Sequence, residues 1–274
     1  MKKKLFFLFL VFGFLYSENF PKRIVSLSPA ITEDIFILSQ GDKIVGNTIY
    51  CTRPEKAKYI EKVGSVIDVN IEKIYSLKPD IVFATNLTNP KDVKKLKELG
   101  INVVVFSYPE NFKKLCDDFI EIGRLIGKEK KAREIVERVK KELEEIKRQA
   151  QKRERPKVLV QVGAHPLWVA GKESFINDII EFAGGINVIE KGGIYSYEQI
   201  IKLNPDVIII TLMGIDGEEE KKNWKKYNMI NAVKNDRILI MDSDKICSPT
   251  PLTFVEVVKF FTRSNLAKNK KRIN

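Results

Sequence analysis

The sequence predicts an α/β protein made of two Rossmann-like lobes with parallel sheets, joined by a single long helix. Three observations support this fold class: one segment occurs twice, apolar strands alternate with helices, and an uninterrupted charged helix separates the two halves. Alternating strands and helices indicate parallel sheets with helices on both faces. The expected organisation is a signal peptide at 1–17, an N-terminal lobe at 18–126, a linking helix at 127–155 and a C-terminal lobe at 156–274.

The repeated segment reads IEKIYSLKPDIVFAT at 71–85 and YEQIIKLNPDVIIIT at 197–211. Each copy predicts a short helix that begins near its glutamate, because a carboxylate is favourable at a helix N-terminus. The proline ends this helix, and the β-branched run that follows predicts a buried parallel strand. Any helix–strand unit could resemble another, but the residues shared in register favour two related lobes. The shared pairs are Glu72/Glu198, Ile74/Ile200, Leu77/Leu203, Pro79/Pro205, Asp80/Asp206 and Thr85/Thr211.

The flanking sequence continues the alternation. Further strands are predicted at 23–27, 44–46, 102–106, 157–162 and 236–241. Further helices are predicted at 91–100, 112–127, 174–183 and 252–261. After the first strand, the segment SPAITEDI starts a helix that the side chain of Ser28 or Thr32 could cap.

The segment between the halves has its apolar residues three or four positions apart, which places them on one narrow helical stripe. A helix over 128–155, ended by Pro156, would be about 40 Å long. We therefore expect a stiff connection that allows only small lobe movements. A coiled-coil arm is the alternative, although the segment lacks the length and the repeat for one.

The N-terminus has a basic stretch, MKKK, followed by the short apolar run LFFLFLVFGFL. A membrane-spanning helix needs roughly 20 apolar residues, so this run predicts a cleaved signal peptide and a periplasmic protein. An uncleaved anchor is the alternative. Small Ser17 is a plausible last residue of the leader. The first cysteine, Cys51, lies far beyond it, so no cysteine is in place for lipid modification.

The formal charge of +12 is concentrated in the mixed-sign segment 128–155 and in the tail KNKKRIN. Basic and aromatic residues are not interleaved, so we expect no nucleic-acid partner. A Lys/Glu-rich surface is typical of thermophilic proteins. The excess of positive charge could also favour acidic ligands.

The cysteines and the single histidine argue against metal and enzyme chemistry. Cys51, Cys116 and Cys247 fit neither a zinc site nor a CxxC motif. Cys116 lies on a helical apolar stripe and is expected in the core, whereas Cys51 and Cys247 are the one pair that could form a disulfide. His165 alone cannot supply the several ligands of a metal-ion carrier. The sequence also lacks GxSxG and nucleotide fingerprints, so no catalytic residue is expected.

Several segments resemble the helical-backbone class of ABC-importer substrate-binding proteins, which serve ferric siderophores, haem and cobalamin. They are RIVSLSPAITED, GNTIYCTRPEKAKYIEKVG, NIEKIYSLKPDIVFA and PLWVAGKESFINDIIEFAGGINVIE. The last is most similar to the cobalamin branch. The resemblance implies the class III periplasmic-binding-protein fold. It also implies a monomer without a resident cofactor that delivers cobalamin or a related corrinoid to a membrane permease. A ferric siderophore or haem is the alternative ligand. A permease-independent scavenger or sensor and a two-lobed glycosyltransferase are the alternative functions.

The resemblance also implies ligand contacts in a cleft between the lobes. Tyr50 and Trp168 match cobalamin contacts, one on each lobe, and aromatic rings suit a large planar ligand. The other candidates are Ser28, Pro29 and Ala30 in a turn, Tyr195 or Tyr197, and Asp244 with Lys245 in a late loop. Departures from the branch are Thr85 and Asn86, where aromatic residues are expected, and Ile67. They put the ligand in question, and not the fold.

The same resemblance implies that Glu72 and Glu198 dock onto arginines of the permease dimer. They occupy equivalent places on related lobes, so both could meet a twofold partner at once, and two contacts made together reinforce each other. The alternative is that each acid only stabilises the start of its own helix.

Overall fold

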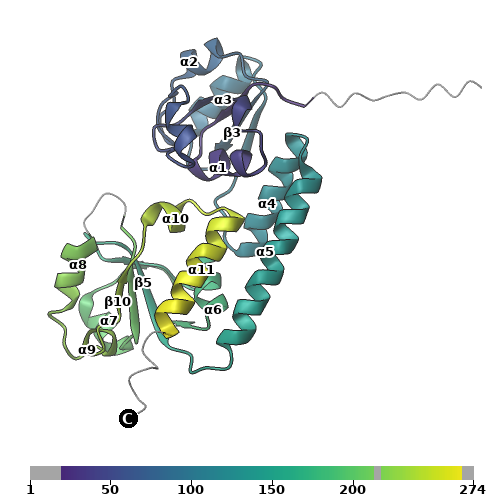
Figure 1. Cartoon of the computed structure of the whole chain (residues 1–274). Coiled ribbons are helices and arrows are strands. Elements are labelled where there is room, and N and C mark those ends of the chain that lie inside the picture. The colour runs from purple at the N-terminus through teal and green to yellow at the C-terminus, as the bar shows by residue number, and fades with distance from the viewer. Residues whose placement is uncertain (1–19, 213–216, 267–274) are drawn as a thin grey trace, which may run out of the picture.

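Two lobes are present, and helix α5 (Glu129–Ala150) runs beside both of them (Figure 1). The computed structural model describes residues 20–212 and 217–266, so the predicted signal peptide lies outside the described residues. Within those two ranges, no helix combines the length and the apolar character needed to cross a membrane.

The sheet of the N-terminal lobe is entirely parallel, as predicted, with the order β2-β1-β3-β4. Its strands β1 and β3 are buried on both faces, which explains why they are continuous apolar runs. The strands are β1 (Ile24–Ser26), β2 (Ile44–Asn47), β3 (Ile81–Thr85) and β4 (Val103–Phe106). The helices are α1 (Pro29–Ile37), α2 (Ile71–Ser76) and α3 (Pro90–Glu98), with short 3₁₀ turns at Gly41–Lys43 and Glu55–Tyr59.

The sheet of the C-terminal lobe is mixed, so the expectation of a purely parallel sheet was wrong here. Its path is β10-β9-β5-β6-β8, with β7 paired to β5, and β6 and β8 run antiparallel to their neighbours. The loop from β5 to β6 is too short for a parallel crossover, which takes a dozen or more residues. The strands are β5 (Lys157–Gly163), β6 (Trp168–Val169), β7 (Ile186–Asn187), β8 (Gly193–Ile194), β9 (Val207–Ile210) and β10 (Ile238–Ile240).

The helices of this lobe are only partly those that the sequence pattern indicated. They are α6 (Phe175–Phe182), α7 (Tyr197–Leu203), α8 (Gly217–Trp224), α9 (Asn231–Lys234), α10 (Ser243–Cys247) and α11 (Pro251–Leu266). Of these, α6, α7 and α11 were predicted. Helix α10 lies on the side of the lobe that faces the N-terminal lobe (Figure 1).

The linking helix is shorter than predicted. It ends at Ala150 and not at Pro156, so its 22 residues extend over about 33 Å. Its last turn packs against the turn after α6, where a Cβ on Gly184 would lie only 2.7 Å from the Cβ of Ala150. Helix α5 also packs against α4 (Phe112–Leu125), α6 and α11, so it is part of the core and not a free rod.

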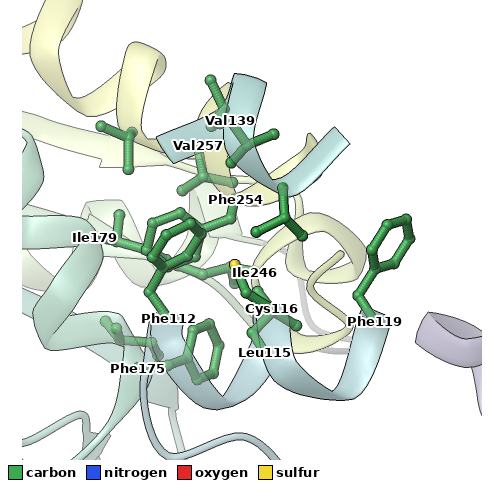
Figure 2. Packing of buried hydrophobic residues seen from close by; sticks show 14 of the residues in the cluster. Phe112, Leu115, Cys116, Phe119, Val139, Phe175, Ile179, Ile246, Phe254 and Val257 are labelled. Carbon is green, nitrogen blue, oxygen red and sulfur yellow. The ribbon is translucent and has the colours of Figure 1, made fainter. Parts of the chain in front are cut away.

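One hydrophobic cluster runs through both lobes and the linking helices. It includes Ile24 in β1, Phe119 in α4, Val139 in α5 and Phe254 in α11, all buried. Figure 2 shows its centre, where side chains of α4, α5, α6 and α11 meet. Cys116 is buried in this cluster, as predicted. The lobes therefore share a core in addition to having their own clusters.

The repeated segment forms equivalent structures, α2 with β3 and α7 with β9. In the N-terminal copy, the Asp80 carboxylate accepts the backbone N–H of Arg23. In the C-terminal copy, the Asp206 carboxylate accepts the backbone N–H of Lys157 at 2.9 Å. After each helix one residue is left-handed, Lys78 with φ 46° and Asn204 with φ 48°. The shared Asp thus fastens the neighbouring strand, which gives the repeat a structural reason.

Candidate functional site

The loops that follow the parallel strands meet between the two lobes. We call this surface the interlobe face. It consists of residues 27–30, 48–54, 85–89 and 107–111 of one lobe and residues 164–167 and 241–250 of the other. Among the described residues, two hydrogen bonds cross it: Arg53 Nη2 donates to the carbonyl of Ser248 at 3.0 Å, and the Tyr108 hydroxyl donates to the carbonyl of Cys247 at 2.9 Å. In open α/β sheets, ligands bind outside the carboxyl ends of the strands, so this is the candidate binding site.

Tyr50 lies on this face in the loop after β2, with 58% of its surface exposed. The loop beneath it is well fixed, because Lys62 Nζ donates to Asn47 Oδ1 at 2.7 Å and to the Ala57 carbonyl at 3.0 Å. The neighbouring Cys51 is fully buried. An exposed aromatic ring on an ordered loop is typical of a binding surface.

Trp168 lies on the opposite lobe, where it starts β6, and 48% of its surface is exposed. Its backbone pairs with Gly163 on one side and Ile194 on the other. A Cβ on Gly163 would lie 3.0 Å from the Cβ of Trp168, so the strand pair is close at this point. The structure thus places the two predicted aromatic contacts on separate lobes, each on a firmly held backbone.

The turn at Ser28, Pro29 and Ala30 leads from β1 into α1, as predicted, but the expected side-chain cap was wrong. Among the described residues, neither Ser28 nor Thr32 caps α1 through its side chain. Thr32 instead lies inside the helix, where its hydroxyl is 2.8 Å from Ser26 Oγ and 3.2 Å from Cys51 Sγ. This buried contact ties α1 to the loop that carries Tyr50.

The two tyrosines beside Glu198 are partly used inside the C-terminal lobe. The Tyr195 hydroxyl donates to the carbonyl of Lys191 at 2.9 Å. Tyr197 stacks on Tyr227 with ring centroids 4.9 Å apart, and its hydroxyl donates to Glu220 Oε1 at 2.9 Å. Burial raises the pKa of Tyr197, and its hydrogen bond to Glu220 raises it further. A ligand contact by Tyr195 stays a prediction.

Charged residues near the crossing hydrogen bonds form a group that the sequence only partly indicated. Arg53 donates to Glu33 Oε2 from Nε at 3.0 Å and from Nη2 at 2.8 Å. Lys245, one of the predicted contacts, forms an ion pair of 3.0 Å with Glu256 on α11. We call Glu33, Arg53, Lys245 and Glu256 the interlobe charge group. Asp244, also predicted, is exposed, and its backbone N–H is bound by the N-cap residue Asp242.

Burial raises the pKa of the Glu33 carboxyl, and the nearby charge of Arg53 opposes this effect. Glu256 and Lys245 also act on Glu33, although they belong to the other lobe. Three members of the group, Glu33, Arg53 and Glu256, were missed from the sequence, as was Tyr108. One feature of the sequence could have identified Arg53: it is the only cation in the loop after β2, at 48–54.

The predicted docking residues lie in equivalent first turns of α2 and α7, on separate lobes (Figure 1). Both Glu72 and Glu198 are exposed. A hydrogen bond with Ser196 lowers the pKa of Glu198. Each helix has its own cap, Asn70 for α2 and Ser196 for α7, so neither glutamate is needed as the capping side chain.

One cavity lies away from the interlobe face, at the opposite end of the C-terminal sheet. It has a volume of about 190 Å³ and is lined in part by Arg155, Pro156, Asp206 and Arg237, near the starts of β5, β9 and β10. Its place at the amino ends of the strands separates it from the interlobe face.

Cys51 and Cys247 are both free thiols in the described structure, so they form no disulfide there.

Residues 24–245 match the model of the periplasmic binding protein family. An uncharacterized ABC transporter substrate-binding lipoprotein of Bacillus subtilis, YvrC, is 36% identical over 84% of this chain and 76% of its own length. The vitamin B12-binding protein of Vibrio parahaemolyticus is 25% identical over 99% of this chain and its full length.

The structure of a possible iron-binding, periplasmic solute-binding protein of Staphylococcus epidermidis superposes with a TM-score of 0.80. The sequence of that protein is 30% identical to this one, and the match covers 90% of this chain and 99% of the Staphylococcus chain. Like these relatives, the chain has the class III fold in which two α/β lobes are joined by a helical backbone. The chain therefore belongs to the periplasmic binding protein family, as a substrate-binding protein of the ABC-importer type.

Proposed function

We propose that this protein captures cobalamin or a related corrinoid in the periplasm and delivers it to the permease of an ABC importer. The observation that carries the proposal is the pair Tyr50 and Trp168, two exposed aromatic rings on separate lobes beside the strand ends. Two rings can contact a wide planar ligand from both sides at little loss of side-chain entropy. The remaining contacts we assign to the 28–30 turn, Tyr195, Asp244 and Lys245.

The relatives support a corrinoid as the ligand. Vitamin B12-binding proteins of several Vibrio species are 25–27% identical to this chain over nearly its whole length. The possible iron-binding protein of Staphylococcus epidermidis favours a ferric chelate as the rival ligand. Haem is the other rival that the sequence resemblance implies.

The proposed mechanism is binding without a chemical reaction, by a monomer exported through its cleaved leader. The shared core across α4, α5 and α11 favours small lobe movements over wide hinge closure. The ligand would thus be released when the permease engages both lobes through Glu72 and Glu198.

Isothermal titration calorimetry on residues 18–274 tests the ligand. Cyanocobalamin, haemin and ferric siderophores are titrated under the same conditions, and we expect the largest affinity for the corrinoid. Tyr50→Ala and Trp168→Ala should each weaken corrinoid binding by about 1–3 kcal/mol, the contribution of a well-packed aromatic contact. Tyr59→Ala is the matched control, because Tyr59 is 82% exposed on the same lobe but lies outside the interlobe face.

Failure of every corrinoid to bind, while haemin or a ferric chelate binds, would refute the corrinoid assignment. Equal losses for Tyr50→Ala and Tyr59→Ala would refute the role of the interlobe face.

A further inference from the structure

Arg53 and Lys245, two basic side chains at the interlobe face, already form ion pairs with acids of the protein itself. We propose that this face selects a ligand without net negative charge, with the interlobe charge group as its specificity determinant. The inference rests on the proposed binding site and deepens it, because it names the charge class of the ligand. It also runs against the simple expectation from the overall charge of +12, which would favour acidic ligands.

Arg53 is the first basic group of this face, and its guanidinium is committed to protein partners. Its Nε and Nη2 donate to Glu33, and Nη2 also donates across the lobes to the Ser248 carbonyl. The third nitrogen, Nη1, has no hydrogen-bond partner among the described residues, but it is buried and so does not face the solvent from which a ligand would approach. An anionic ligand would have to break the bidentate pair with Glu33, which is among the stronger side-chain interactions.

Lys245 is the second basic group, and Glu256 holds its ammonium at 3.0 Å. Lys62 is the third, but it lies under the Tyr50 loop. Its Nζ is within hydrogen-bond distance of Asn47 Oδ1 and of the carbonyls of Thr48, Cys51 and Ala57. An ammonium group has three donors, so these acceptors use its full capacity.

Within the described ranges, three further acids of the same segments form no ion pair with a basic side chain. Glu110 lies in the loop after β4, and Asp242 and Asp244 lie at the start of α10; all three are exposed. Asp242 and Asp244 act electrostatically on Cys247, whose carbonyl receives the Tyr108 hydrogen bond across the lobes. The face therefore has a neutral to acidic charge balance in a strongly basic chain.

This balance separates the ligand candidates by chemistry. Cyanocobalamin is neutral overall, because its phosphodiester balances the charge of the cobalt corrin. Cobinamide lacks the phosphodiester and is cationic. Haemin carries two propionates, and ferric tris-catecholates are strongly anionic. Placing like charges together at an interface costs several kcal/mol, so this face should reject the last two.

The test is a calorimetric panel on residues 18–274 with cyanocobalamin, cobinamide, haemin, a neutral ferric trihydroxamate and a ferric tris-catecholate. We expect both anions to bind at least about tenfold more weakly than the tightest neutral or cationic ligand, a difference of about 1.4 kcal/mol. Binding of the neutral ligand should change little between about 0.05 and 0.5 M salt, because no net charge is being screened.

Glu33→Gln and Glu256→Gln test the charge group directly, each by releasing a cation from its acid. Each should raise the affinity for haemin relative to the tightest neutral ligand by about tenfold at low salt. Glu121→Gln is the matched control, since it releases Arg124 in the same way on α4, outside the interlobe face. Thermal unfolding checks that the variants fold, and two independent variants keep the test decisive if one does not.

The proposal is overturned if wild-type protein binds haemin or the tris-catecholate more tightly than every neutral or cationic ligand. It is also overturned if neither folded variant shifts the ratio beyond the Glu121→Gln control. A tightly bound neutral trihydroxamate with no corrinoid binding would refute the corrinoid function and leave the charge selection supported, so the two failures are distinguishable.

Discussion

The carboxylate of Asp80 accepts the backbone N–H of Arg23 at 2.9 Å, while the backbone N–H of Asp80 donates to the Arg23 carbonyl at 2.8 Å. This reciprocal pair, reinforced by the N–H of Lys22, fixes the entry into β1. Asp206 repeats it with Lys157 at the entry into β5. The aspartate that the two copies of the repeat share thus fixes the entry into a strand in both lobes.

Asp80→Ala should lower the free energy of unfolding by about 1 kcal/mol, because two backbone donors lose a charged acceptor. These hydrogen bonds lower the pKa of Asp80, so their contribution is present above the unfolded-state pKa of about 3.9 and is lost as the pH falls through the folded-state value. Urea unfolding at several pH values measures both effects. Asp206→Ala is expected to lower the free energy of unfolding by a similar amount, because the backbone N–H of Lys157 loses the same acceptor. A neutral result for both variants would contradict the role assigned to the repeat.

Lys78→Asn should stabilise the protein by about 0.5–1 kcal/mol. Lys78 has φ 46° after α2, a conformation in which a lysine Cβ is crowded and asparagine is better tolerated. The other copy of the repeat already has Asn204 with φ 48° at the same place. The reciprocal change Asn204→Lys should destabilise by more, because it also removes the acceptor Oδ1 that binds the backbone N–H of Asn231 at 2.8 Å. Thermal unfolding follows both changes. Equal stability of both variants and wild type would rule out this account.

Asp34→Asn should stabilise the protein near neutral pH by about 1 kcal/mol, because the amide has the size of the carboxyl but no charge to bury. Asp34 is 4% exposed in α1, and its Oδ1 has no hydrogen-bond partner within the described ranges. Burial raises its pKa well above the usual value, and the charges of Glu33 and Asp118 raise it further.

The pH profile gives the sign of this prediction. Because the folded-state pKa of Asp34 is raised, wild type loses stability as the pH rises from the unfolded-state value of about 3.9 to the folded-state value, and the loss is constant above it. The advantage of Asp34→Asn should therefore shrink toward about pH 4 in thermal unfolding. An advantage of Asp34→Asn that is independent of pH would contradict this account.

Glu72→Arg combined with Glu198→Arg should reduce ligand uptake through the cognate permease at least about tenfold, because both contacts change sign at once. Calorimetry should show unchanged ligand affinity, since both side chains lie on α2 and α7 and outside the interlobe face. Glu98→Arg with Glu134→Arg makes the same change in net charge elsewhere. Uptake by the Glu72/Glu198 variant at the rate of this control would exclude docking through the pair.

The two lobes could be predicted from the sequence because the patterns that indicate them are local. The repeat, the apolar strands and the stripe that buries Cys116 all depend on neighbours within a few residues. The early end of α5 could not be seen, because QAQKRE continues a helix-favouring composition and the end is set by packing of Ala150 on Gly184.

The contacts between the lobes could not be predicted from the sequence, for a related reason. Arg53 and Ser248 are 195 positions apart, and no local pattern marks their hydrogen bond. Glu33 and Glu256 look like ordinary surface acids of helices until the fold brings them beside Arg53 and Lys245. The family resemblance therefore located the aromatic candidates Tyr50 and Trp168, whereas the charge balance around them emerges only in three dimensions.

The hydrophobic cluster that passes from Ile24 through Val139 to Phe254 has a consequence for fragments of the chain. A polypeptide cut between α4 and α5 would leave each piece with apolar surface that only the other piece can cover. Such halves should be poorly soluble when produced alone and should restore a native complex when produced together. Their recovered ligand binding would then report reassembly, as in a split-protein reporter.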